Sequence, residues 1–173
     1  MKKLYVLRHA KSLSDNESMN DHARPISDHG RENAERIGEY LKEQNIHPDL
    51  VLCSTALRAR MTLEQVQKGM GASLNVAYSD KLYLAPAGEM FSQAQAIDDR
   101  YSSALMVGHN PGMHQFCLLL TGRGDARSRK TLELKFPTCA LAEFELDVAS
   151  WREIVPGAGT LHQFLAPKLL PVD

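Results

Sequence analysis

The fold is decided by residues 4–9, which read Leu4-Tyr5-Val6-Leu7-Arg8-His9. Four apolar residues follow one another without alternation, a pattern typical of a strand that is buried on both faces of a parallel sheet. Arg8 and His9 stand where this strand ends. Because ligands of parallel α/β sheets bind beyond the carboxyl ends of the strands, we expect both side chains to face a binding crevice.

Further apolar runs predict more strands, and a helical pattern follows each of them. The predicted strands are residues 50–53, 74–77 and 104–107, and the predicted helices are residues 28–44, 56–70, 89–96 and 111–120. Residues 121–130 are polar and predict a loop, whereas residues 132–136 fit a short strand or an ordered loop. Residues 140–146 and 151–155 predict a C-terminal β-hairpin. This order predicts a three-layer α/β/α fold, in which helices cover both faces of a mostly parallel sheet.

Size and charge narrow the class of protein. A chain of 173 residues without repeats or linkers predicts a single domain over residues 1–173. Twenty basic and 21 acidic residues give a net charge of −1, so no overall field favours nucleic acid or an anionic membrane. No apolar run approaches the roughly 20 residues that cross a bilayer. We expect a cytoplasmic monomer, in which Cys53 and Cys117 are reduced core residues.

Two other strand ends carry residues of the same kind as Arg8 and His9. Arg58 lies in the first turn of the helix after the second strand, and His109 directly follows the fourth strand. The planar guanidinium of arginine binds phosphoryl oxygens in pairs. A neutral imidazole can attack phosphorus near pH 7, and neighbouring arginines favour that neutral form. One such residue alone is usually structural, but their joint placement at three strand ends predicts a phosphoryl-transfer site that needs no metal or other cofactor.

Three motifs, in this order along the chain, resemble the signature of the histidine phosphatase superfamily, also called the phosphoglycerate-mutase-like family. They are Leu7-Arg8-His9-Ala10-Lys11-Ser12, Ser54-Thr55-Ala56-Leu57-Arg58-Ala59-Arg60-Met61-Thr62 and Gly108-His109-Asn110-Pro111. The resemblance implies that His9 is the phosphorylated nucleophile. It also implies that Arg8, Arg58 and His109 form the phosphate pocket.

The short chain and its Arg-His-Ala-Lys-Ser opening are similar to the SixA branch, the small protein-phosphohistidine phosphatases. Residues 21–30 resemble that branch's Asp-x-x-Arg-Pro-Leu-x-x-x-Gly element, with Arg24 at the arginine position. This resemblance adds Arg24 and Ser12 to the residues expected to bind the substrate. It implies a phosphorylated protein as the partner.

Larger family members carry a Glu or Asp between the second and third motifs that protonates an alkoxide leaving group. Asp80 and Glu89 lie in that region, but both also suit ordinary structural roles in a turn and a first helical turn. General acid catalysis is worth about 10²–10⁴-fold, and imidazole leaves phosphohistidine more readily than an alkoxide leaves an ester. The sequence therefore favours phosphohistidine on a protein, such as a phosphorelay domain, as the substrate.

Two other functions stay open. A true acid at Asp80 or Glu89 would favour a small-molecule phosphomonoesterase or mutase, and a non-catalytic phosphohistidine-binding module would need no nucleophile. The five remaining histidines are expected to be structural or surface residues: His22, His29, His47, His114 and His162. A basic cluster is expected on a solvated loop or in contact with an acidic partner protein: Arg123, Arg127, Arg129 and Lys130.

Overall fold

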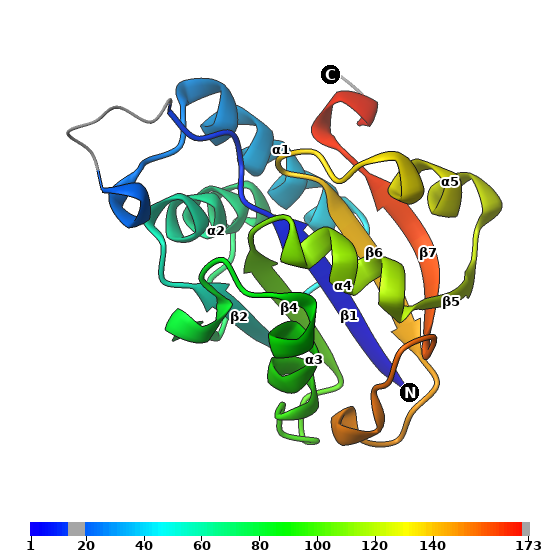
Figure 1. Ribbon diagram of the computed structural model, residues 1–173. Coiled ribbons are helices and arrows are strands. Elements are labelled where there is room, and N and C mark those ends of the chain that lie inside the picture. Colours follow the sequence, from blue (N-terminus) through cyan, green and yellow to red (C-terminus); the bar gives the residue numbers. More distant parts are fainter. Residues whose placement is uncertain (14–19, 171–173) are drawn as a thin grey trace.

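The computed structural model describes residues 1–13 and 20–170, and within them seven strands form one sheet (Figure 1). The strands are β1 (Lys2–Arg8), β2 (Leu50–Ser54), β3 (Val76–Ser79), β4 (Ser103–Gly108), β5 (Thr121–Gly124), β6 (Leu141–Leu146) and β7 (Gly159–Leu165). The helices are α1 (Asp28–Glu43), α2 (Leu57–Met70), α3 (Ala87–Gln95), α4 (Gly112–Leu120) and α5 (Ala126–Leu134). Short 3-10 turns are η1 (Asp21–Ala23), η2 (Asp80–Leu82), η3 (Trp151–Glu153) and η4 (Pro167–Leu169).

The strand order is β3-β2-β4-β1-β6-β7-β5, and the first four strands run parallel. Strand β6 is antiparallel to both of its neighbours, and β5 is parallel to β7. In the register of β1 and β4, Arg8 lies opposite Gly108, and the N–H of His9 donates to the Gly108 carbonyl at 3.0 Å. The chain therefore leaves both strands at the same level, with His9 and His109 next in sequence.

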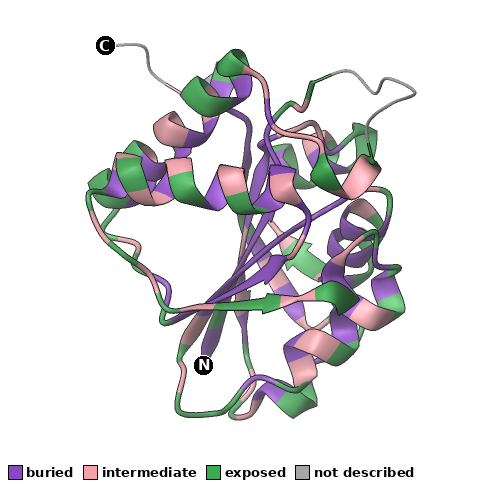
Figure 2. Ribbon diagram, turned by 90° about the vertical axis from the view of Figure 1, so that its left-hand side faces the viewer, coloured by how far each residue is buried: buried purple, intermediate pink, exposed green. Residues whose placement is uncertain are grey.

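Two hydrophobic cores lie on opposite faces of the sheet. Along β1, Leu4 and Val6 belong to the core beneath α3 and α4, whereas Tyr5 and Leu7 belong to the core beneath α1 and α2. Figure 1 shows these two pairs of helices on the two faces, and Figure 2 shows the buried strands between them. The predicted three-layer fold with a mostly parallel sheet is confirmed.

The C-terminal third differs from the sequence prediction. Residues 121–130 are not a loop: they form β5 and the start of α5, which ends at Leu134, within the segment expected as a short strand or an ordered loop. A C-terminal antiparallel pair exists, but β6 pairs with β7 rather than with residues 151–155. Those residues include η3, where the fully buried Trp151 donates its indole N–H to the Tyr101 carbonyl at 2.8 Å. An apolar residue that anchors a turn was thus mistaken for part of a strand.

Helices α1 and α2 approach closely through two glycines. A Cβ atom on Gly38 would lie 2.1 Å from the Val66 carbonyl oxygen, and one on Gly69 would lie 2.0 Å from that of Glu35. Neither distance is compatible with a side chain, so both positions require glycine for this packing. The contact holds α2, and with it Arg58, against the rest of the domain.

The three cysteines are free and buried. Burial raises the pKa of the Cys53 and Cys139 thiols to about 12, and it also raises the pKa of Cys117. They are thiols at neutral pH, as expected for Cys53 and Cys117. In the described part of the chain, no helix combines the length and the apolar character needed to cross a membrane.

Candidate active site

His9 follows β1 and has only 7% of its surface exposed. Its Nδ1 atom lies 2.8 Å from the carbonyl oxygen of Ala10. Because a carbonyl can only accept, Nδ1 carries the proton and Nε2 keeps its lone pair. The pKa of this imidazole is lowered to about 4, first by burial and then by the positive charges of Arg8, Arg58 and Arg24. At neutral pH, His9 therefore presents an unprotonated Nε2.

Thr62 supports the backbone of Ala10, the residue whose carbonyl binds the His9 ring. Its buried hydroxyl accepts a hydrogen bond from the Ala10 N–H at 2.8 Å and donates one to the Arg58 carbonyl at 2.6 Å. One side chain thus connects the end of β1 to the first turn of α2. The sequence analysis assigned Thr62 no role, although it closes the second motif.

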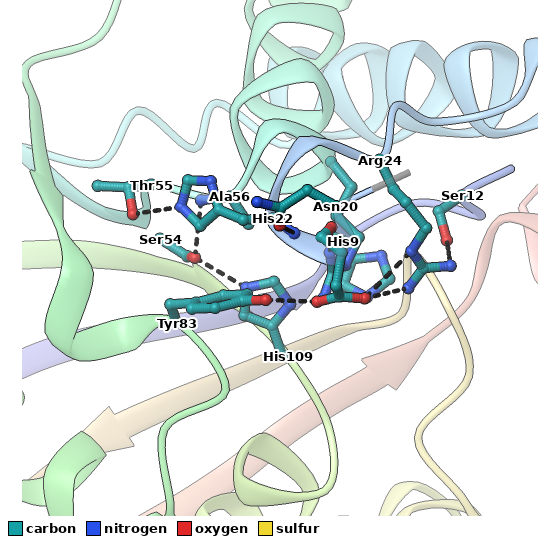
Figure 3. A network of polar contacts seen from close by, with 12 residues as sticks. His9, Ser12, Asn20, His22, Arg24, Ser54, Thr55, Ala56, Tyr83 and His109 are labelled. Carbon is teal, nitrogen blue, oxygen red and sulfur yellow. Dashed lines mark hydrogen bonds and ion pairs between the residues drawn. The ribbon is translucent and has the colours of Figure 1, made fainter. Parts of the chain in front are cut away.

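His109 lies beside His9, with 5.2 Å between the ring centroids. Its Nε2 atom is 2.7 Å from the Ser54 hydroxyl, which also accepts the Ala56 N–H at 3.2 Å (Figure 3). Ser54 is the last residue of β2, so the neighbouring strand sets the orientation of this ring. Burial, followed by the charges of His9 and the nearby arginines, lowers the pKa of His109 to about 3. Both histidines are neutral at pH 7.

Arg8 and Arg58 direct part of each guanidinium to protein groups. Arg8 Nη1 donates to the Phe136 carbonyl at 3.0 Å, and Arg58 Nη1 donates to the Asp21 carbonyl at 2.8 Å. The Nε atoms of both arginines and Nδ1 of His109 are buried and have no hydrogen-bond partner among the described residues. An unpaired buried polar group costs about 1–3 kcal/mol, so three of them in one site mark a place where a ligand or ordered water would supply the missing partners.

The Asp21 carboxylate connects the two sides of this pocket. Its Oδ1 accepts from Arg24 Nη2 at 3.0 Å, and its Oδ2 accepts from Arg58 Nη2 at 3.2 Å and from the Tyr83 hydroxyl. The hydrogen bond from Tyr83 and the charges of both arginines lower the pKa of Asp21 to about 2. The Tyr83 ring also packs edge-on against His109, with 5.5 Å between centroids. In the sequence analysis, Asp21 was only the first residue of the 21–30 element, and no pattern pointed to Tyr83.

Arg24 and Ser12, the two other expected pocket residues, contact each other. Arg24 Nη1 donates to the Ser12 hydroxyl at 3.1 Å and to the Leu13 carbonyl at 3.2 Å (Figure 3). The rest of the Arg24 fork faces Asp21. The structure therefore places both residues beside the pocket, and their contact with phosphate stays a prediction.

Comparison with known proteins agrees with this geometry. The family model of the histidine phosphatase superfamily (branch 1) matches residues 4–101. The chain belongs to the histidine phosphatase superfamily. An uncharacterised protein of Mycobacterium tuberculosis is 31% identical over 164 residues, which cover 94% of this chain and the whole of that protein.

Several similar proteins carry the SixA name. The phosphohistidine phosphatase SixA of Escherichia coli is 30% identical over 114 residues, which cover 62% of this chain and 67% of that protein. A solved structure assigned to the phosphohistidine phosphatase SixA of Agrobacterium tumefaciens is 29% identical, with a TM-score of 0.81. The match covers 96% of this chain and 98% of that one. The sequence-based resemblance to the histidine phosphatase superfamily is confirmed.

The other residues singled out from the sequence lie at or beyond the edge of this histidine phosphatase site. The exposed Asp80 accepts the Thr55 hydroxyl proton, and Glu89 on α3 accepts from Gln93 at 3.0 Å. His22 stands at the rim, 3.0 Å from the Thr55 hydroxyl. The exposed basic cluster lies on β5 and α5 rather than on a loop: Arg123, Arg127, Arg129 and Lys130. Among the described side chains, no group of His, Cys, Asp and Glu is placed to hold a metal ion.

Proposed function

We propose that this protein hydrolyses phosphohistidine on a protein substrate through a phosphoryl intermediate on His9. The observation that carries the proposal is the group of three unpaired buried atoms beside an imidazole with a free Nε2. The Nε atoms of Arg8 and Arg58 are donors that suit phosphoryl oxygens. With Ser54 donating its hydroxyl proton to Nε2 of His109, the Nδ1–H of that ring becomes the third donor. Such preorganised donors stabilise the charge of the transferring group.

The reaction has two steps. Nε2 of His9 attacks phosphorus in line, and the P–N bond of the substrate breaks. Its electron pair stays on the leaving imidazole, which takes a proton from solvent. Water then attacks the phosphoryl group on His9, the Nε2–P bond breaks, and inorganic phosphate departs from a neutral His9. The Nδ1–H bond to Ala10 persists through both steps and keeps Nε2 as the reacting atom.

The protonation state of the carboxylates near the site favours an imidazole leaving group over an alkoxide. Asp21, the carboxylate nearest the arginines, has a pKa of about 2 and holds no proton to donate at neutral pH. Asp80 accepts a hydrogen bond from Thr55 and Glu89 accepts one from Gln93, and among the described residues neither carboxylate is hydrogen-bonded to His9. Lacking general acid catalysis, worth about 10²–10⁴-fold, the site suits a substrate whose leaving group departs readily. The similarity to E. coli phosphohistidine phosphatase SixA supports the same substrate class.

The test uses a histidine-containing phosphotransfer domain labelled with ³²P on its histidine. The unmodified enzyme should release phosphate, His9→Ala should release none, and rapid quenching should trap acid-labile phosphate on the unmodified enzyme. His162→Ala is the matched control, because His162 is exposed and pairs with Glu145 outside the site. Equal release by the unmodified enzyme and His9→Ala would refute the mechanism. Faster hydrolysis of a sugar phosphate would identify a phosphomonoesterase, and binding without turnover would identify a binding module.

A further inference from the structure

A groove of about 600 Å³ lies beside the phosphoryl pocket and is lined by His22, Thr55, Arg60, Glu64, Gln67 and Tyr78. Its volume falls within the roughly 300–1,000 Å³ typical of ligand sites. The groove joins the pocket through aromatic contacts. The His22 ring packs edge-on against Tyr83 with 4.8 Å between centroids, and Tyr83 packs against His109. A substrate whose phosphoryl group reaches His9 can therefore extend into this groove.

Arg60 supplies the positive charge of the groove, and Glu64 is the acidic residue of its lining. Its Nε donates to the Thr55 carbonyl at 3.0 Å, which turns the guanidinium back toward the start of α2 and the phosphoryl pocket. Its Nη1 and Nη2 atoms have no hydrogen-bond or ion-pair partner among the described residues. Glu64 is four residues further along α2, yet it forms no ion pair with Arg60 within the described part of the chain. The free edge of the guanidinium matches the two oxygens of a carboxylate.

Tyr78 gives the groove an aromatic wall. It lies on β3, the edge strand of the sheet, and 52% of its surface is exposed. Tyrosine offers a large contact area and loses little conformational entropy on binding, which suits the recognition of a polypeptide. An exposed tyrosine alone is ordinary. Together with Arg60, and next to the His22 ring that borders the phosphoryl pocket through Tyr83, it describes a surface for a peptide segment with an acidic side chain.

We infer that this groove binds the segment of the substrate protein that flanks its phosphohistidine, with a carboxylate of that segment paired to Arg60. The inference rests on the proposed function, because the phosphoryl group of that segment must reach His9. It adds a selectivity that the phosphoryl pocket itself cannot provide. That pocket contacts only the phosphoryl oxygens and the leaving nitrogen, whereas the groove distinguishes one phosphohistidine sequence from another.

The experiment uses two phosphohistidine peptides, identical except for Glu or Lys residues flanking the phosphohistidine, and phosphoramidate as a P–N substrate without flanks. The unmodified enzyme should show a kcat/KM about tenfold higher for the Glu peptide. Arg60→Glu should abolish or reverse that preference and leave phosphoramidate hydrolysis unchanged. The matched control is Arg152→Glu, which should keep the preference. Arg152 is an exposed residue of η3, and the ring of its neighbour Trp151 lies against Lys2, at the opposite end of β1 from His9.

Each outcome has one meaning. A preference for the Glu peptide that disappears only in Arg60→Glu supports the groove. Equal turnover of both peptides by the unmodified enzyme overturns the groove and leaves the proposed function standing. A loss of phosphoramidate hydrolysis in Arg60→Glu also overturns it, because Arg60 would then act on the phosphoryl pocket. An unmodified enzyme that hydrolyses a sugar phosphate but no P–N bond overturns the proposed function itself.

Discussion

The Thr62 hydroxyl lies 2.8 Å from the backbone nitrogen of Ala10, and the carbonyl of Ala10 in turn accepts the Nδ1 proton of His9. A side chain on α2 therefore helps to position the residue whose carbonyl fixes the tautomer of a histidine that follows β1. Because Thr62 also bonds the Arg58 carbonyl, the same hydroxyl sets the spacing between the candidate nucleophile and an arginine of the pocket.

Replacing that hydroxyl with a methyl group in Thr62→Val should lower kcat by about 10- to 100-fold with little change in KM, because small displacements of reacting groups have effects of this size. Steady-state kinetics on the phosphohistidine substrate measure the effect. Thr62→Ser keeps the hydroxyl and should stay within about threefold of the unmodified enzyme. A Thr62→Val variant with an unchanged kcat would show that Ala10 holds His9 without this support.

The pH profile should reflect the lowered pKa of His9. Since that pKa of the free enzyme is about 4, the imidazole is neutral above it, and kcat/KM should stay level from pH 8 to about 5. It should fall only as the pH approaches 4, where Nε2 takes up a proton and loses its lone pair. Imidazole ¹⁵N shifts measured by NMR over the same range should show no titration of His9 near pH 6.5. A midpoint near 6.5 would contradict the burial of a neutral nucleophile.

Asp21→Asn should lower kcat/KM by about tenfold or more, because the neutral amide cannot form ion pairs with the guanidinium groups of Arg58 and Arg24 and so no longer orients them. Kinetics with the phosphohistidine substrate provide the measurement. Asp98→Asn is the matched control and should leave kcat/KM unchanged, since the ion pair of Asp98 is with the exposed Arg100. Higher activity in Asp21→Asn would instead mean that this carboxylate competes with the phosphoryl group for Arg58.

Gly38→Ala should reduce the free energy of unfolding by about 1–3 kcal/mol, since the added methyl group would overlap the Val66 carbonyl and push α1 from α2. Chemical denaturation monitored by circular dichroism measures the change. Gly88→Ala is the matched control, because a Cβ at that helical position meets nothing within 4 Å. It should leave stability unchanged or raise it by up to about 1 kcal/mol. Equal effects of the two substitutions would contradict the close packing of α1 and α2.

The central parallel strands could be predicted from the sequence because strands buried on both faces are continuous apolar runs. Strands β1, β2 and β4 were found in this way, and the residues that follow them were placed correctly at one edge of the sheet. Strand β7 was missed because His162 and Gln163 are both exposed, beside an irregularity in its pairing with β6, and break the alternation of a half-buried strand. Helix α5 was missed because its polar sequence buries only Ser128 and Leu132.

The candidate site likewise contains residues that the sequence predicts and residues that only the structure reveals. His9, Arg8, Arg58 and His109 were found because each follows a recognisable strand. Three residues that orient them were not assigned a role: Ser54, Thr62 and Tyr83. Their effect arises only from contacts between distant segments, such as that of the Ser54 hydroxyl with the His109 ring 55 residues away. No local spacing encodes such a contact, so it needs the folded chain.

The burial of all three thiols makes the molecule easy to label. Cys53, Cys117 and Cys139 are inaccessible and protonated at neutral pH, so no native cysteine reacts with a maleimide dye. A single cysteine substituted at an exposed position would be the sole point of attachment, without replacement of any native cysteine. A fluorophore placed in this way beside the edge strand would report in real time when a phosphoprotein arrives and leaves.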